Sequence, residues 1–368
     1  MRVIIAGGGI VGLTAAVALG RTGADVVVCE QAGEVRAGGA SIGLWRNALD
    51  VFDDIGAGDM ANDLGTLVST WFYDPSGRPY RALGSGAADH EFLLLPRARL
   101  TESLAGMVGP SSLRLGRKVV GFEEDGDGVT VLFQDGTGER ADLLVGADGV
   151  HSRVRDGLVP GFPAREHRGH HAWRATVPSG DEPAGGSVLT VGRHRTRGGF
   201  ARTHGGRVMW MVNQFGCGPL TGTAKEQALA RAGHLSDGRW NEALTKLIES
   251  TPDEAILHDQ IMRVPPLPRW TSGRVVLAGD AAHGLSPHIA AGGTLGVEDV
   301  GVLVRALARY PSQGAALKAY EADRLSRFER VREFSDAVEG AGGPEDYARH
   351  YAAFSRWMLT GRTAAGLT

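Results

Sequence analysis

The first thirty residues alternate between two short apolar runs and an alanine-rich stretch. Residues 2–6 (RVIIA) and 25–29 (DVVVC) are apolar, and residues 13–19 between them suit a helix. Short apolar runs bounded by glycine are typical of strands buried on both faces of a parallel sheet. The pattern therefore predicts a β-α-β unit at the start of the chain.

Further along, the pattern changes more than once. Short strand-like stretches occur within 70–95 and 114–133, a helical pattern within 96–107 and a buried strand at 143–146. Residues 165–215 alternate between apolar and polar positions, as in an antiparallel sheet with one buried face. A helical pattern at 225–250, an apolar strand at 274–278 and a long helical stretch complete the chain.

These changes predict an interleaved α/β protein with three parts. Residues 1–69, 97–165 and 266–335 are expected to form a Rossmann-like nucleotide-binding domain with a doubly wound parallel sheet. Residues 70–96 and 166–265 would form an inserted, mainly antiparallel β-sheet domain for the substrate. Residues 336–368 would be a helical C-terminal segment, in which an apolar stripe at helical spacing must be buried, most simply within the chain itself. The stripe consists of Tyr347, Tyr351, Phe354 and Met358.

A glycine-rich turn joins the first strand to the first helix. Gly7, Gly9 and Gly12 fit the pattern G-x-G-x-x-G, which permits a tight turn, close approach of a pyrophosphate and close helix–strand packing. Free N–H groups at the helix N-terminus favour the pyrophosphate. Glu30 ends the second strand at the distance expected for a carboxylate that binds ribose hydroxyls, which favours FAD or NAD over NADP.

Composition narrows the possible classes of function. The chain has 368 residues, is 42% hydrophobic and carries a net charge of −3, so no nucleic-acid partner is indicated. Cys29 and Cys217 are too far apart for a redox pair, and no metal-binding signature is present. No apolar run is long enough for a membrane span. We expect a cytoplasmic protein, monomeric or homodimeric, that acts on a small molecule.

Two later segments repeat the arrangement of an apolar run followed by a small or acidic turn. These are residues 142–155 (DLLVGADGVHSRVR) and 274–300 (RVVLAGDAAHGLSPHIAAGGTLGVEDV). Each would bring its backbone and one carboxylate to the same dinucleotide. With these motifs the chain resembles, from its start to about residue 335, the class A FAD-dependent monooxygenases. These are the single-component aromatic hydroxylases similar to para-hydroxybenzoate hydroxylase and the urate- and salicylate-hydroxylase-like flavoproteins.

The resemblance implies a set of FAD contacts. Arg36 and Arg97 match flavin-contacting arginines, Asp148-Gly149 matches a motif used for both FAD and NAD(P)H, and Asp280 matches the aspartate that binds the ribityl chain. The full set is Gly7, Gly9, Ile10, Val11, Gly12, Glu30, Gln31, Arg36, Arg97, Val119, Asp148, Gly149, Arg153, Gly279, Asp280, Pro287, Ala290, Ala291, Gly292, Gly293 and Thr294. The family commonly has G-Q-G-x-N after Pro287. This chain has lost the amide side chains there, so backbone N–H groups are the expected contacts.

The resemblance also implies the chemistry. FAD, reduced by NADH or NADPH, would react with O2 to a flavin C4a-hydroperoxide that hydroxylates a small aromatic or heteroaromatic substrate. A phenolic substrate would gain from a nearby base. His170, His171, His283 and His288 are candidates, although a single histidine is more often a core or surface residue. We expect catalytic roles for His288 above all, and for His283 and Arg46.

The substrate is expected to contact residues near the flavin and on the inserted sheet. The predicted contacts are Arg46, Trp71, Trp173, Trp210, Pro287 and His288, with Met209, Met211, Asn213 and Phe215 as further candidates. Neighbours on a strand point to opposite faces, so Met209 and Trp210 cannot both face the substrate.

The sequence leaves three alternative functions to consider. The same flavin chemistry serves epoxidation or oxidative rearrangement of a natural-product intermediate. A halogenase is disfavoured because W-x-W-x-I-P is absent. A non-catalytic protein that keeps the FAD-binding fold is disfavoured by Arg36, Arg97, Asp148 and Asp280, although the altered loop at 290–294 keeps it possible.

Overall fold

The computed structural model describes residues 1–35, 40–68, 71–81, 91–180 and 187–360, so Arg36 lies outside the described residues. Five parallel strands form its first sheet, in the order β18-β12-β1-β2-β8. The predicted β-α-β unit is present, with α1 (Ile10–Arg21) between the first two strands. The strands are β1 (Arg2–Ala6), β2 (Asp25–Cys29), β8 (Leu113–Arg114), β12 (Leu143–Gly146) and β18 (Val275–Leu277).

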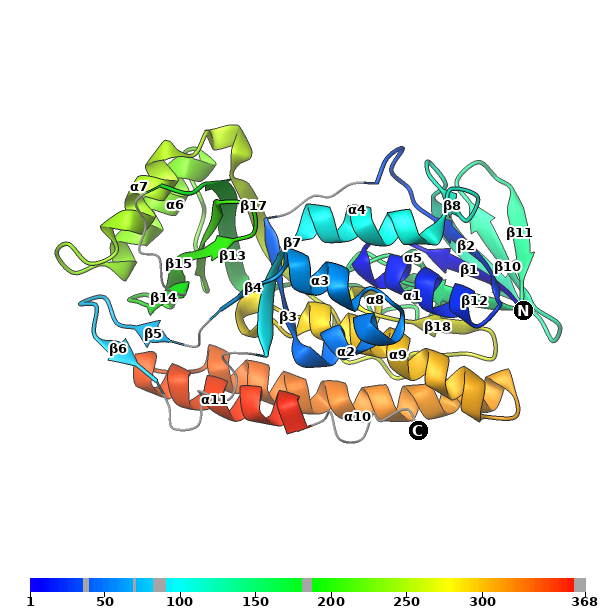
Figure 1. The fold of residues 1–368 in the computed structure, drawn as a ribbon. Helices are drawn as coiled ribbons and strands as arrows, with labels where there is room; N and C mark the ends of the chain where they lie inside the picture. Colours follow the sequence, from blue (N-terminus) through cyan, green and yellow to red (C-terminus); the bar gives the residue numbers. More distant parts are fainter. Residues whose placement is uncertain (36–39, 69–70, 82–90, 181–186, 361–368) are drawn as a thin grey trace.

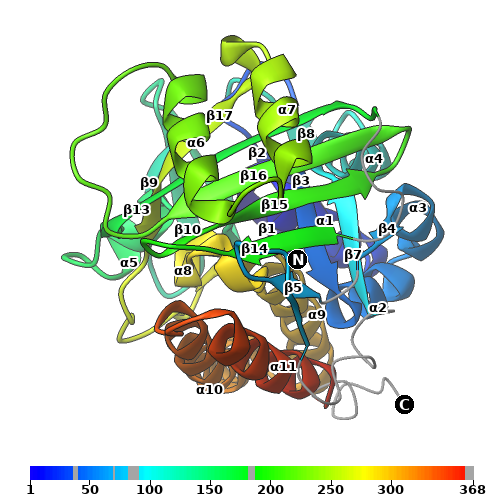
Figure 2. The ribbon, with the colours of Figure 1, turned by 90° about the vertical axis from the view of Figure 1, so that its left-hand side faces the viewer.

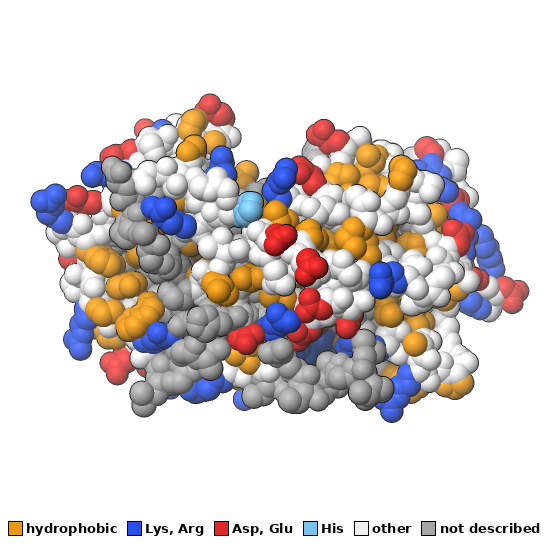
Figure 3. All heavy atoms as spheres, viewed as in Figure 1, with side chains coloured by type: hydrophobic (Ala, Val, Ile, Leu, Met, Phe, Trp, Pro, Cys, Tyr) orange, Lys and Arg blue, Asp and Glu red, His pale blue; other side chains and the backbone are white. Residues whose placement is uncertain are grey.

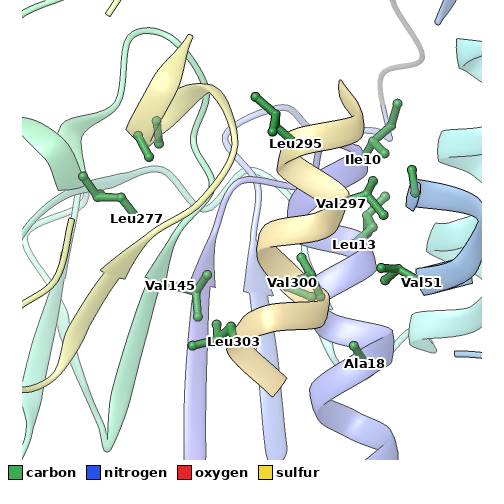
Figure 4. Close-up of a cluster of buried hydrophobic side chains, with 14 of the residues drawn as sticks. Ile10, Leu13, Ala18, Val51, Val145, Leu277, Leu295, Val297, Val300 and Leu303 are labelled. Carbon is green, nitrogen blue, oxygen red and sulfur yellow. The ribbon is translucent and has the colours of Figure 1, made fainter. Parts of the chain in front are cut away.

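Helix α9 (Gly292–Arg309) packs beside α1 (Figure 4). Leu13, Val297 and Val300 are buried at this contact, and each buried side chain of this size contributes about 1.5–3 kcal/mol. The two helices come close because Gly296 lies between them: a Cβ there would be 2.6 Å from Cγ2 of Val11. Segments almost 300 residues apart in the sequence therefore share one core.

A seven-stranded sheet forms the second large element, in the order β17-β13-β16-β15-β14-β5-β6 (Figures 1 and 2). All its strand pairs are antiparallel except β14 with β5. The long strands are β13 (Arg165–Pro178), β14 (Ser187–Val191), β15 (Thr196–Thr203), β16 (Arg207–Gln214) and β17 (Leu257–Arg263). Two short strands, β5 (Phe72–Tyr73) and β6 (Pro79–Tyr80), follow β14 at one end of the sheet. The antiparallel sheet predicted for 165–215 is confirmed.

The helical pattern at 225–250 forms two helices rather than one. Helix α6 (Ala224–Ala232) and helix α7 (Glu242–Ser250) are separated by a short 3-10 turn and a loop. Gly238 has φ +68° and Asn241, which directly precedes α7, has φ 66°, and a continuous right-handed helix cannot contain residues in this left-handed conformation. Both helices cover one face of the seven-stranded sheet (Figure 2).

Smaller elements surround the parallel sheet. Strands β3 (Ser41–Trp45), β7 (Phe92–Pro96) and β4 (Thr66–Leu67) form one antiparallel sheet, and β9 (Val119–Glu124), β10 (Val129–Phe133) and β11 (Gly138–Ala141) form another. Helices α2 (Arg46–Asp54), α3 (Gly58–Leu64), α4 (Arg97–Val108), α5 (Arg153–Leu158) and α8 (Asp280–His283) complete this part.

Two long helices follow at the C-terminal end. Helix α10 (Gln313–Glu339) runs beneath both sheets in Figure 1, and α11 (Pro344–Thr360) packs on it. The apolar stripe on α11 is buried within the chain as predicted: Tyr347 and Tyr351 pack on Phe72, and Phe354 packs on Trp45. Within the described part of the chain, no helix combines the length and apolarity needed to cross a membrane.

Candidate active site

A cavity of about 470 Å³ lies between the parallel-sheet part and the seven-stranded sheet. The surface is hollowed between these two parts, at the upper edge of the view in Figure 3. One wall contains the starts of α1 and α9 together with Asp280, and the opposite wall contains Met209, Met211 and Asn213 of β16. Two helix N-termini thus meet the same cavity, each with free N–H groups that favour an anion.

The glycine-rich turn has the geometry expected for a pyrophosphate site. Gly7 has φ +102°, and a Cβ there would be 2.4 Å from the carbonyl oxygen of Ala147. A Cβ on Gly12 would be 2.0 Å from the carbonyl oxygen of Gly7, so this glycine lets α1 approach β1. Gly9, by contrast, lines the cavity and has no atom within 4 Å of its Cβ position. The first and third glycines allow packing, and the second leaves room for a ligand.

The carboxylate of Glu30 stabilises this turn through hydrogen bonds. One carboxylate oxygen accepts a hydrogen bond from the N–H of Gly8 at 2.7 Å and the other from the N–H of Ala32 at 2.8 Å. Each oxygen keeps a second lone pair, which leaves Glu30 able to bind ribose hydroxyls. Gln31 follows it and is exposed.

Asp280 is exposed and lines the cavity at the start of α8. The preceding Gly279 has φ +63°, and its N–H donates to Oδ2 of Asp299 at 2.8 Å. Asp299 is fully buried and also accepts from His283 Nε2 at 2.7 Å and from Arg324 Nε at 2.7 Å. Burial alone would raise the pKa of Asp299, but His283 and Arg324 lower it to about 2. A buried charge therefore holds the turn that presents Asp280.

The loop that departs from the family pattern lies at the start of α9. Ala290 is left-handed, with φ 52°, and Ala290, Gly292 and Gly293 all line the cavity. Ala291 is buried, and the Thr294 hydroxyl accepts a hydrogen bond from the N–H of Trp45 at 3.0 Å. The loop therefore presents backbone groups and small side chains to the cavity, and their contact with a flavin stays a prediction.

Hydrogen bonds within the Asp148 motif hold its carboxylate in place. Oδ2 of Asp148 accepts from the N–H groups of Arg153 at 2.7 Å and Val154 at 3.2 Å, and burial raises the pKa of Asp148. Gly149 lines the cavity, as do Ile10, Val11, Arg97 and Pro287. Val119 is buried in β9, and the Arg153 guanidinium faces Asp156 at 3.4 Å; neither is among the described residues that line the cavity.

Alternation along β16 decides which sheet residues face the cavity. Met209, Met211 and Asn213 line it, whereas Trp210 between them is fully buried in the core beneath α6 and α7. The Trp210 indole N–H donates to the Thr251 hydroxyl at 2.9 Å. These positions argue against the expected substrate contact of Trp210.

Trp173 borders the cavity, but its ring belongs to the same core as Trp210. It stacks on His258 with ring centroids 4.8 Å apart, and its N–H donates to Gln227 at 3.2 Å. Contact between a substrate and the Trp173 ring is therefore disfavoured. Trp71, by contrast, lines the cavity and is 37% exposed.

The three residues expected to be catalytic lie in very different surroundings. Arg46 forms ion pairs with Asp50 at 2.9 Å and Asp53 at 2.8 Å along α2, and is not among the described cavity residues. His283, paired with Asp299, is not among them either. His288 does line the cavity, but Ser286 and the carbonyl of Ser335 occupy both of its ring nitrogens, at 2.7 and 2.9 Å.

Burial, followed by the charge of Arg197, lowers the pKa of His288 to about 3. A neutral imidazole with both nitrogens engaged is poorly placed to take a proton from a substrate. The geometry therefore argues against a general-base role for His288, and against direct catalytic contact of His283 and Arg46.

Sequence reasoning missed Tyr351 of α11, which lines the cavity from the C-terminal helix. Its place in the apolar stripe indicated burial, but no local signal connected that stripe to the site.

Comparison with known proteins agrees with this geometry. The family model described as FAD binding domain matches residues 1–335. An aurachin C monooxygenase/isomerase of Stigmatella aurantiaca is 32% identical over 363 residues, covering 97% of this chain and 92% of that protein. A FAD-dependent urate hydroxylase of Klebsiella pneumoniae is 33% identical over 345 residues, covering 89% and 86%. The crystal structure of Klebsiella pneumoniae HpxO with FAD and uric acid has a TM-score of 0.84 at 27% identity, covering 99% of this chain and 96% of that one.

The matched region contains every FAD motif of the sequence. It also contains every residue described above as lining the cavity, except Tyr351. The chain therefore belongs to the FAD binding domain family and, within it, to the class A FAD-dependent monooxygenases.

Proposed function

We propose that the protein hydroxylates a small aromatic or heteroaromatic substrate bound between the flavin and the seven-stranded sheet, with NADH or NADPH as reductant and O2 as co-substrate. The observation that carries the proposal is the shared cavity: glycine-rich backbone and Asp280 form one wall, and the side chains of β16 form the other. The urate hydroxylase relative, named for a heteroaromatic substrate, matches most of the chain.

The sheet side of the cavity suits a flat apolar ring. Leu94, Met209 and Ala201 form a small apolar cluster there, with Val68 and Met211 packed against it. Methionine side chains are flexible and polarisable, so they adapt to an aromatic surface. Arg174 also borders the cavity, but its guanidinium faces Asp259 at 2.5 Å. An aromatic substrate with few charges fits these walls best.

The residues of the opposite wall fit FAD. In our proposal the start of α1 binds the pyrophosphate, Glu30 binds ribose, Asp280 binds the ribityl chain, and backbone N–H groups at 290–294 bind the flavin ring. Bound FAD supplies hydride acceptance and oxygen activation. The protein's share is orientation and exclusion of water, to which the buried residues around His288 contribute.

The domain division expected from the sequence is also part of the proposal. Residues 1–69, 97–165 and 266–335 would bind FAD, 70–96 and 166–265 would bind the substrate, and 336–368 would form the helical C-terminal segment. Tyr351 supports a role for this last segment, since it reaches the cavity from α11. We propose a monomer or homodimer, with all site residues supplied by one chain.

The first experiment is the visible spectrum of the purified protein, followed by turnover. Oxidised-flavin bands, FAD released on denaturation, and NAD(P)H oxidation stimulated by an aromatic compound are expected. Incorporation of one oxygen atom from 18O2 into the product, measured by mass spectrometry, identifies hydroxylation. Asp280→Asn should weaken FAD retention, whereas the matched change Asp63→Asn on the exposed surface of α3 should not. A protein that binds no FAD, or whose substrate gains no oxygen, contradicts the proposal.

A second candidate is epoxidation or oxidative rearrangement by the same flavin chemistry. The match to an aurachin C monooxygenase/isomerase favours it. Product analysis separates the two: a hydroxylated ring supports the first function, and a rearranged or epoxidised skeleton supports the second.

A further inference from the structure

A buried chain of hydrogen bonds ends beside the cavity and is unused by the proposed function. His288 Nε2 lies 2.9 Å from the carbonyl oxygen of Ser335, and His288 Nδ1 lies 2.7 Å from the Ser286 hydroxyl. The same hydroxyl lies 3.0 Å from Nδ1 of His170. All of these groups are buried.

Both histidines are neutral near pH 7. Burial and then Arg197 lower the pKa of His288 to about 3, and burial and then His167 lower the pKa of His170 to about 3. A neutral imidazole has one N–H and one lone pair, so each ring in the chain can donate only once.

The protons of this chain can be placed one after another. A carbonyl only accepts, so His288 Nε2 carries the hydrogen and donates it to Ser335. His288 Nδ1 then accepts the single hydrogen of Ser286. The Ser286 oxygen is left only to accept, so His170 Nδ1 carries the hydrogen of that ring. His170 Nε2 is consequently a lone pair that needs a donor.

Asn213 of β16 pairs with Ala172 of β13, two residues after His170, and both Asn213 and Ala172 line the cavity. Asn213 is 3% exposed and lies close enough to His170 for its amide to oppose part of the shift in the histidine's pKa. Neither His170 Nε2 nor Asn213 Oδ1 has a partner among the described residues. The two ends of an amide are assigned from the bonds they make, and only the NH2 end can satisfy His170 Nε2. The carbonyl end of Asn213 then remains for the cavity.

We propose that Asn213, oriented by Ser286 and His170, presents a hydrogen-bond acceptor to the substrate and so selects an aromatic compound that carries a donor, a phenolic O–H or a ring N–H. The inference rests on the proposed function for the place of the substrate and adds the chemical group that is recognised. Asn213 is the specificity residue, and Ser286 is a positioning residue that acts through His170.

Pairs of ligands with and without the hydrogen-bond donor test this assignment. The FAD-loaded protein is titrated with 1-naphthol, 2-naphthol and 4-hydroxyquinoline and with their O-methyl ethers, and each dissociation constant is measured by calorimetry. The ethers should bind the wild-type protein about tenfold or more weakly, as expected when a buried acceptor is left unpaired. Asn213→Leu should abolish the preference, and Asn213→Asp should keep it because a carboxyl group still offers an acceptor.

Two further variants separate orientation from packing. Ser286→Ala should reduce the preference, because His170 is then free to turn its N–H toward Asn213. Asn62→Leu makes the same chemical change on the exposed surface of α3 and should leave the preference intact. The inference is overturned if the wild-type protein binds ethers as tightly as phenols, if it binds neither, or if Asn213→Leu keeps the wild-type ratio. FAD content and NAD(P)H oxidation report separately on the proposed function.

Discussion

Asp299 is the residue whose replacement tests most directly how the turn that presents Asp280 is stabilised. Its carboxylate is fully buried and holds Gly279, His283 and Arg324 at 2.7–2.8 Å. Asp299→Asn keeps the shape and an acceptor for the Gly279 N–H but removes the charge opposite Arg324. Removing one partner of a buried ion pair costs about 3–5 kcal/mol, because the remaining charge is left uncompensated.

The geometry places the expected cost at the lower end of that range. Glu298 still faces Arg324 at 3.1 Å, so about 3 kcal/mol is the appropriate figure. With an unfolding entropy of about 2.1 cal/mol/K per residue, a chain of 368 residues has about 0.8 kcal/mol/K in all. The thermal midpoint should therefore fall by about 4 °C.

The assay is the thermal midpoint of protein stripped of FAD, so that ligand binding does not shift the transition. Glu333→Gln is the matched control, because it breaks a pair with Arg330 whose side chains are 61% and 53% exposed. An exposed pair of this kind contributes little, so that midpoint should move by less than about 1 °C. If the two variants lose the same amount, the buried carboxylate does not stabilise the turn as argued.

Two more outcomes follow from the geometry. Gly12→Ala should abolish FAD retention, measured as the ratio of flavin to protein absorbance, because the added Cβ would lie 2.0 Å from the Gly7 carbonyl oxygen. Gly20→Ala in the same helix should retain FAD, because no atom lies within 4 Å of its Cβ position. Equal FAD retention by both variants would refute the packing argument. Acidification should lower the thermal midpoint between pH 6.5 and about 3, because His170 and His288 stay neutral in the fold while the unfolded chain binds protons on them from 6.5 downward. A midpoint that does not fall across this window would show that these histidines are not held neutral.

The sequence by itself determined the dinucleotide-binding half of this protein. The spacing of Gly7, Gly9 and Gly12 marks one turn, and the structure gives a reason for each glycine: a Cβ would clash at Gly7 and at Gly12 and would have open space at Gly9. Glu30 is recognisable by the same kind of spacing, because it directly follows the last residue of β2. The Gly12 clash is with Gly7 in the same turn, whereas the Gly7 clash is with Ala147 from a distant segment. The fixed spacing of the three glycines and Glu30 still makes these positions recognisable in the sequence.

The substrate side was decided only by tertiary structure. The alternation along β16 was clear, but only packing against α6 and α7 chose Trp210 for the core and Met209 for the cavity. His288 was a reasonable base by sequence, yet Ser335, 47 residues away, occupies one of its nitrogens. Tyr351 reaches the site from a helix at the far end of the chain. The protonation and orientation of these groups depend on contacts between distant segments, which no pattern of neighbouring residues encodes.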